Sequence, residues 1–164
     1  MNVAVKLVFE CIIYCGVFFG LVKLSVLKSP LTGVFWYPKD VQERIYNLGL
    51  ADRKKQKRRA ARFKSFFILV LAVTIIYMVS VINKPDDFLS AYLQLLLILT
   101  VSVWFDKIVI DTIWVGTDFW KIPGTEDLQI KKPLKVRVMA CFIMPMMYAI
   151  LALPVAWMIS LFGI

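Results

Sequence analysis

Apolar residues in this chain gather in four long blocks, and charged segments separate the blocks. The blocks cover approximately residues 3–27, 66–82, 88–109 and 138–164. A helix needs about 20 mainly apolar residues to cross the hydrocarbon of a bilayer. In lipid, helices also satisfy their own backbone hydrogen bonds. The pattern therefore predicts an all-α fold, an integral membrane four-helix bundle in which residues 1–164 form a single transmembrane domain.

The composition excludes an ordinary soluble domain. Of the 164 residues, 60% are apolar, whereas soluble domains contain roughly 45–50% apolar residues. A chain of this length cannot bury so much apolar surface in a water-soluble core. The same excess is expected if most of the apolar side chains face lipid.

The charges predict how the chain is oriented in the membrane. Residues 28–65 contain eleven Lys or Arg residues against three acidic ones, whereas the short turn 83–87 contains Lys84, Asp86 and Asp87. Because positively charged loops stay in the cytoplasm, loops 28–65 and 110–137 are predicted to be cytoplasmic. The protein is then a multi-pass cell-membrane protein with both termini outside.

A dense basic cluster precedes the second apolar block, and Asp52 is positioned to cap a helix that runs from this cluster into the block. A cluster of this kind beside a span is typical of anionic-lipid binding. It has no nucleic-acid-binding fold around it, so nucleic acid is not an expected partner. The predicted basic cytoplasmic helical loop contains Arg53, Lys54, Lys55, Lys57, Arg58, Arg59, Arg62 and Lys64.

The first block contains a glycine motif and an acidic residue. Gly16 and Gly20 form GxxxG, which lets helix backbones approach closely. Packing within the bundle is the favoured interpretation, and a homo-oligomer interface is the alternative. Lys6 and Glu10 lie one turn apart and are expected to pair. Glu10 and, in the third block, Gln94 are the candidate polar groups within the membrane.

The stretch from Trp104 to Asp127 contains five of the eleven acidic residues. Its catalytic candidates are Asp106, Asp111, Glu126 and Asp127. If the fold gathered these carboxylates, they could bind a hard divalent cation such as Mg²⁺. On an α-helix, however, Asp106 and Asp111 lie about 140° apart and do not share a face, whereas Lys107 and Asp111 can pair. The alternative is a charged helix end followed by a solvated turn, with no assured metal site.

Aromatic residues flank the predicted spans, and such rings favour the boundary between headgroups and hydrocarbon. The predicted interface aromatics are Trp36, Tyr37, Trp114 and Trp120. A short helix is expected to begin at Asp40 and to stop at Gly49.

Two stretches carry a family resemblance. The segment FWYPKDVQE at 35–43, and IDTIWVG with KIPGTED within 110–127, resemble an uncharacterised group of small bacterial four-span membrane proteins. The resemblance implies a bacterial inner membrane location and implies no activity.

Three functions follow as hypotheses. The first is an oligomeric transport or channel-like component that uses Glu10 and Gln94. The second is a membrane-embedded enzyme acting on a phospholipid or isoprenoid phosphate at the cytoplasmic face through the carboxylates of 106–127. The third is an accessory subunit of a membrane complex.

Overall fold

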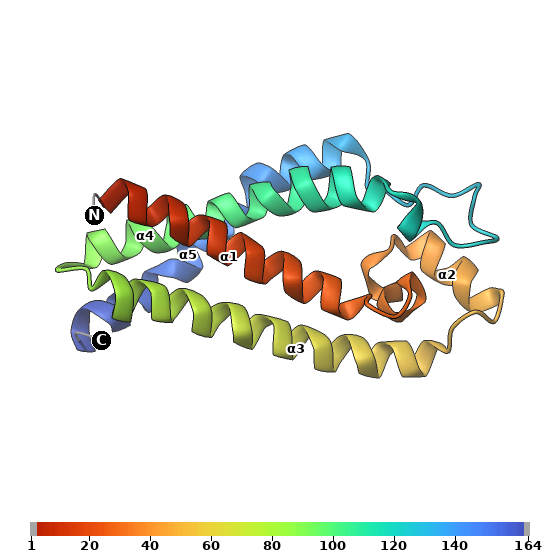
Figure 1. The fold of residues 1–164 in the computed structure, drawn as a ribbon, viewed down its shortest axis with the longest axis horizontal. Helices are drawn as coiled ribbons and strands as arrows, with labels where there is room; N and C mark the ends of the chain where they lie inside the picture. Colours follow the sequence, from red (N-terminus) through yellow and green to blue (C-terminus); the bar gives the residue numbers. More distant parts are fainter. Residues whose placement is uncertain (1–2, 163–164) are drawn as a thin grey trace.

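Long helices dominate the computed structural model, which describes residues 3–162 (Figure 1). Four of these helices are long and apolar enough to cross a membrane, so the expected all-helical four-helix bundle is confirmed. They are α1 Val3–Ser25, α3 Arg53–Tyr77, α4 Phe88–Phe105 and α5 Leu134–Phe162. π-Helices η2 Met78–Asn83 and η3 Asp106–Ile113 extend α3 and α4, and the 3-10 helix η4 Trp114–Gly116 follows η3.

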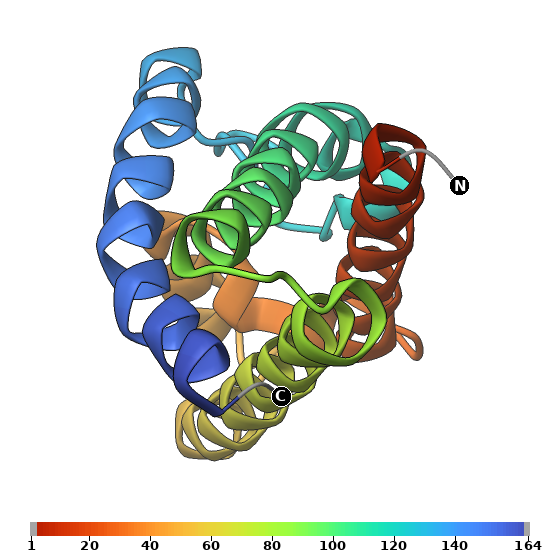
Figure 2. The ribbon, with the colours of Figure 1, turned by 90° about the vertical axis from the view of Figure 1, so that its left-hand side faces the viewer.

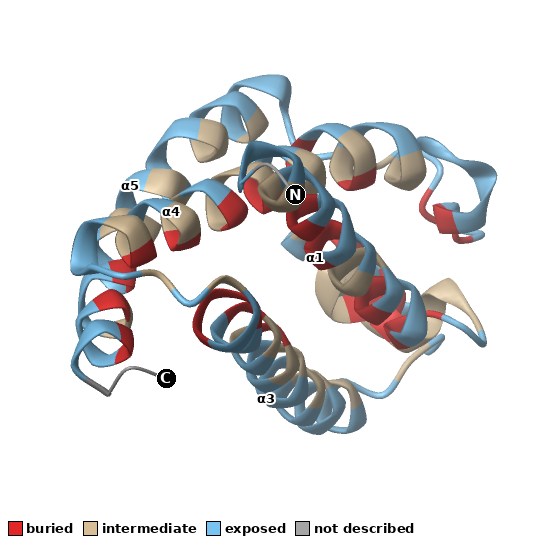
Figure 3. Cartoon of the chain, turned by 60° about the vertical axis from the view of Figure 1, so that its left-hand side comes forward, coloured by how far each residue is buried: buried red, intermediate tan, exposed pale blue. Residues whose placement is uncertain are grey.

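In the end-on view, α4 lies between α1 and α5, and α3 lies across the bundle from α4, next to α1 (Figure 2). Buried residues follow the inner sides of the helices, whereas the outer surfaces are exposed (Figure 3). Tyr14, Val79, Leu95, Ile98 and Ala156 lie in the core of the bundle. Within residues 3–162, α3 and α5 share no extensive contact. The bundle therefore has a weakly closed seam between these two helices.

The cap predicted at Asp52 agrees with the structure, and a second acidic cap begins α4. The Asp52 side chain accepts a hydrogen bond of 2.6 Å from the Lys55 backbone N–H and caps α3. Asp87 accepts one of 2.7 Å from the Ser90 N–H and caps α4.

Because α3 continues from the basic cluster into its apolar part, all eight basic side chains project from one helix, and all eight are exposed.

A second, smaller core forms a cap on the bundle end opposite the start of α1 (Figure 1). The cap consists of η1 Pro30–Trp36, α2 Lys39–Asn47, η5 Asp118–Trp120 and the following residues to 130. Val34, Val41 and Ile45 are fully buried in it. The expected start of α2 at Asp40 is wrong: the helix begins at Lys39 after the N-cap Pro38, and Asp40 lies in the first turn. Gly49, with φ of 69°, follows the end of the helix as expected.

The aromatic residues predicted for the membrane interface divide into two groups. Trp36 and Trp114 are partly exposed. Tyr37 and Trp120, by contrast, are 5% and 2% exposed and pack against each other in the cap core. For these two, the expectation that the side chain faces the headgroup boundary is wrong, because the cap folds over them.

The GxxxG motif does not mediate packing inside the bundle. Gly16 and Gly20 are exposed, and a Cβ atom placed on either would meet no atom within 4 Å. The favoured interpretation of close packing within the chain is therefore wrong, because no neighbouring helix of the described chain approaches these glycines closely. A homo-oligomer interface on this face stays a prediction.

Candidate functional site

A buried lysine bound to two aspartates marks the end of α4. Lys107 is 7% exposed, and its ammonium group binds Asp106 and, at 2.9 Å, the Oδ2 atom of Asp111. The predicted pairing of Lys107 with Asp111 is thus confirmed. The expectation that Asp106 and Asp111 lie on different faces is wrong. The two residues belong to the π-helix η3, whose i→i+5 geometry brings residues five apart to the same side.

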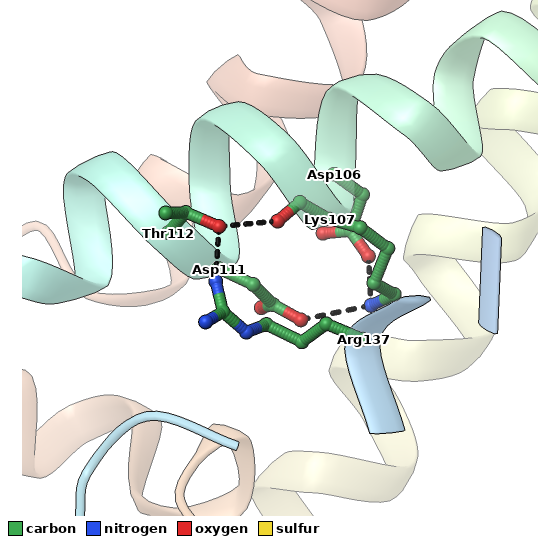
Figure 4. Close-up of polar contacts among 5 residues, drawn as sticks. All are labelled: Asp106, Lys107, Asp111, Thr112 and Arg137. Carbon is green, nitrogen blue, oxygen red and sulfur yellow. Dashed lines mark hydrogen bonds and ion pairs between the residues drawn. The ribbon is translucent and has the colours of Figure 1, made fainter. Parts of the chain in front are cut away.

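The π-helix is joined to α5 by a short polar chain (Figure 4). The Thr112 hydroxyl donates a hydrogen bond of 2.8 Å to the Lys107 carbonyl oxygen, and Arg137 of α5 donates one to the Thr112 hydroxyl oxygen. The Nε atom of Arg137 is buried and has no hydrogen-bond partner within residues 3–162. This chain connects the position of Lys107 to the first turns of α5.

The Lys107 cluster faces a cavity of about 250 Å³ between the bundle and the cap, which we call the polar pocket. Helices α1, α3 and α5, η3 and two cap segments contribute to it. Its charged lining consists of Asp106, Lys107, Asp111 and Lys132. Its other lining residues are Phe18, Val22, Trp36, Tyr37, Phe67, Ile110, Val115, Trp120, Ile130 and Met144. A buried lysine, three further charged side chains and several aromatic rings thus meet in one small space.

Tyr37 and Trp120 form the cap side of the polar pocket. The Tyr37 hydroxyl donates a hydrogen bond of 2.9 Å to the Trp120 carbonyl oxygen. Burial raises the pKa of Tyr37, so this hydroxyl stays a donor at neutral pH. The indole Nε1 of Trp120 is buried and finds no acceptor in the described chain. An unsatisfied buried N–H costs free energy, so this donor lacks the hydrogen bond that would offset its burial.

An apolar groove of about 420 Å³ runs along the seam between α3 and α5, and we call it the α3–α5 groove. Ile68, Ile76 and Leu151 contribute to its lining and are exposed, so it reaches the surface of the bundle. The groove and the polar pocket share Phe18 and Phe67, whose rings pack edge to face at 5.1 Å. An apolar space open to the surface therefore adjoins a charged one.

A larger groove of about 840 Å³ lies between α1 and α4, where exposed Gly16 contributes to its lining. Its lining is almost entirely apolar, from Ala4 and Leu7 on α1 to Val101 and Ile108 on the α4 side. Because no charged residue lines it, this groove is suited to contact with lipid chains and is not the candidate site.

The four candidate carboxylates do not form one cluster. Asp106 and Asp111 bind Lys107, whereas Asp127 pairs with Arg44 at 3.1 Å. Glu126 accepts hydrogen bonds of 2.9 and 3.0 Å from the Gly124 N–H, which hold the pKa of its carboxyl below the usual value. Within residues 3–162, no group of three or more acidic, histidine or cysteine side chains is arranged to bind a metal ion. The conceivable Mg²⁺ site of the four carboxylates is therefore not assembled.

Glu10 lies at the other end of the bundle and does not pair with Lys6 as expected. The Lys6 ammonium donates to the Ile82 carbonyl oxygen at 2.6 Å, and Asn83 donates to Glu10 Oε2 at 2.8 Å. The correction has a physical cause, because the end of η2 offers both a carbonyl acceptor and an amide donor. Glu10 is 4% exposed, and its Oε1 has no partner in the described chain. The Oε1 of Gln94 is likewise buried and unpartnered there.

Several residues of the site carry no signal in the sequence. Lys132 is one of many basic residues, and Phe18 and Phe67 resemble any other apolar span residue. Lys107 does carry a signal, because a lysine between two aspartates interrupts an apolar block.

The fold and the pocket define the class of the protein: an all-helical chain with four helices able to span a membrane and a charged cavity at one end. Comparisons with protein-family models, curated proteins and solved structures find no match.

Proposed function

We propose that the protein binds a membrane amphiphile, with the apolar chain in the α3–α5 groove and the polar head in the polar pocket. The observation that supports this most directly is the shared lining of the two spaces. Phe18 and Phe67 border both the apolar groove and the cavity that contains Lys107. A ligand that reaches both spaces has to be apolar at one end and polar at the other.

The dimensions and position of the two spaces agree with this proposal. Their volumes of about 250 and 420 Å³ together fall in the range of roughly 300–1,000 Å³ that is usual for small-molecule sites. The seam lies on the outer surface of a bundle whose apolar helices would face lipid. The apolar chain of a ligand can therefore enter the α3–α5 groove directly from the bilayer without passing through water.

The proposal places the polar pocket at the cytoplasmic face. The positive charge of 28–65 favours that side, and the eight exposed cations of α3 would attract anionic lipids, at about 1 kcal/mol each near the surface. Arg53 is partly committed, since it binds Glu43 and lies 4.9 Å from the centre of the Tyr46 ring. Arg59 also donates a hydrogen bond of 3.4 Å to the Ser25 carbonyl oxygen, and the other six cations are exposed along the same helix. Binding, rather than catalysis, is proposed because both carboxylates in the pocket are bound to Lys107.

Filling the α3–α5 groove tests this function. Ala72 lines the groove and is half-buried, so Ala72→Phe places an aromatic ring where the apolar chain of the ligand would lie. We expect photo-crosslinking by a single-chain amphiphile with a diazirine in its chain to fall at least tenfold, in nanodiscs of uncharged lipid. The expected reduction follows from loss of the chain's contact area with the groove.

The matched control is Val73→Phe, the next residue of the same helix, which is exposed and does not line the groove. This variant should crosslink as the unaltered protein does, mainly to α3 and α5 peptides. Equal labelling of all outer helix surfaces, unchanged by Ala72→Phe, would exclude the groove as a binding site.

A second candidate function is proton or cation transport by an oligomer. It is favoured by Glu10, a buried carboxylate within an apolar helix with one oxygen unpartnered. Buried intramembrane carboxylates are typical of ion and proton pathways. Gln94, also with an unpartnered buried oxygen, would supply a second polar group.

Glu10→Gln tests the transport function, because it keeps the side-chain shape and removes the ionisable group. In liposomes with a pH-sensitive dye inside, we expect proton flux to fall to the level of protein-free vesicles. Lys6→Gln, which changes a neighbouring residue bonded only to a backbone carbonyl in the described chain, should retain most of the flux. Flux that is the same with and without Glu10 would eliminate its role.

A further inference from the structure

We infer that the head group accepted by the polar pocket is a phosphate group, bound by the Trp120 indole N–H and the Lys132 ammonium. This inference rests on the proposed function and specifies its ligand. It starts from the polar atoms that the fold leaves without partners around the pocket.

The unsatisfied atoms here are donors. Trp120 is 2% exposed, and its Nε1–H has no acceptor within residues 3–162. The buried Nε–H of Arg137 on α5 also lacks an acceptor there, although Arg137 lies outside the pocket lining and its guanidinium binds Thr112. An indole N–H can only donate. A ligand that satisfies Trp120 therefore has to offer an acceptor atom.

Both carboxylates of the pocket already bind a cation. Asp106 and Asp111 both bind Lys107, so two negative charges surround one positive charge. Lys132 lines the same pocket and interacts electrostatically with Asp106. It forms no ion pair within 4.0 Å in the described chain. Its ammonium group is thus the cation that a ligand can engage without displacing an aspartate.

A phosphate ester fits these groups better than an uncharged head does. It carries negative charge and several acceptor oxygens, so one oxygen can accept from Trp120 while another binds Lys132. Hydrogen bonds to ionised groups are stronger than those between neutral groups, and lysine is a common phosphate ligand. A sugar or glycerol head would satisfy the indole N–H and leave the ammonium charge uncompensated.

The same chemistry occurs in a lipid phosphate and in free phosphate, so the experiment uses three probes. The full-length protein, in nanodiscs of uncharged lipid, is titrated with dodecyl phosphate, with dodecanol and with inorganic phosphate. Displacement of the diazirine amphiphile reports binding of the first two probes, and isothermal titration calorimetry reports binding of the third. We expect dodecyl phosphate to bind at least tenfold more tightly than dodecanol, and inorganic phosphate to bind far more weakly than either.

Trp120→Phe keeps an aromatic ring in the cap core and removes the N–H. We expect this variant to lower the affinity for dodecyl phosphate about tenfold, as loss of a hydrogen bond to a charged group implies. The affinity for dodecanol should not change. Lys132→Gln should have a similar selective effect and, since Lys132 is exposed, is a second test if Trp120→Phe impairs folding. The matched controls are Trp114→Phe and Lys131→Gln, which alter residues outside the pocket lining and should not change the preference.

The results separate the inference from the function on which it rests. Equal affinity for dodecanol and dodecyl phosphate, with both weakened by Ala72→Phe, overturns the phosphate head and leaves amphiphile binding in place. Displacement by neither dodecyl compound overturns the proposed function. Tight binding of inorganic phosphate that depends on Trp120 supports the anion site. It overturns the proposed role of the ligand's alkyl chain in binding.

Discussion

Replacing Lys107 with methionine should destabilise the folded protein by about 3–5 kcal/mol. Methionine fills much of the same space but carries no charge, so Asp106 and Asp111 would face each other without the ammonium group that binds both. Removing one partner of a buried ion pair leaves an uncompensated charge, and this cost exceeds the worth of the pair itself. Denaturation in mixed micelles, followed by circular dichroism, measures the change.

Two further variants distinguish charge from packing. Lys107→Arg keeps the positive charge and should retain most of the stability. Adding Asp106→Asn and Asp111→Asn to Lys107→Met removes the uncompensated charges and should recover more than half of the loss. If the triple variant is as unstable as the single one, the cause is packing rather than electrostatics. A single variant as stable as the unaltered protein would contradict the buried ionic cluster.

Trp120→Ala should open the cap while leaving the bundle folded. Truncating a fully buried tryptophan costs about 3–5 kcal/mol, and the Trp120 ring packs in the cap core against Tyr37 and against Trp114, which borders that core. The bundle core consists of a separate set of side chains. We therefore expect limited proteolysis within residues 28–52 and 117–133 to accelerate on the order of a hundredfold, with little loss of helical signal.

Trp157→Ala is the matched control, because Trp157 is 58% exposed on the outer side of α5. Its cleavage rate should stay close to that of the unaltered protein. If Trp120→Ala instead unfolds the whole chain in one step, cap and bundle form a single cooperative unit, and the separation described here is wrong.

Local features of the site could be predicted wherever neighbouring residues determine them. Asp52 and Asp87 are short acceptors before helical stretches, and both act as caps. Lys107 and Asp111 are four residues apart, a spacing that allows side chains on an α-helix to pair. None of these interactions requires knowledge of a distant segment.

Features that depend on an irregular helix or on distant partners could not be predicted. Asp106 and Asp111 lie on the same side because η3 is a π-helix, which a count at 100° per residue does not anticipate. Glu10 binds Asn83, 73 positions away. Trp120 and Tyr37 are placed in the cap core by contacts between residues 83 positions apart, and interfacial preference alone predicts the opposite exposure for them.

The sequence by itself determined that this chain is helical and has four segments fit to cross a membrane, because hydrophobic length and backbone hydrogen bonding are properties of each segment. Only the tertiary structure decided which polar side chains meet, because burial and pairing depend on contacts between segments far apart in the chain. The polar pocket exists only once α1, α3, η3, α5 and the cap are assembled around Lys107.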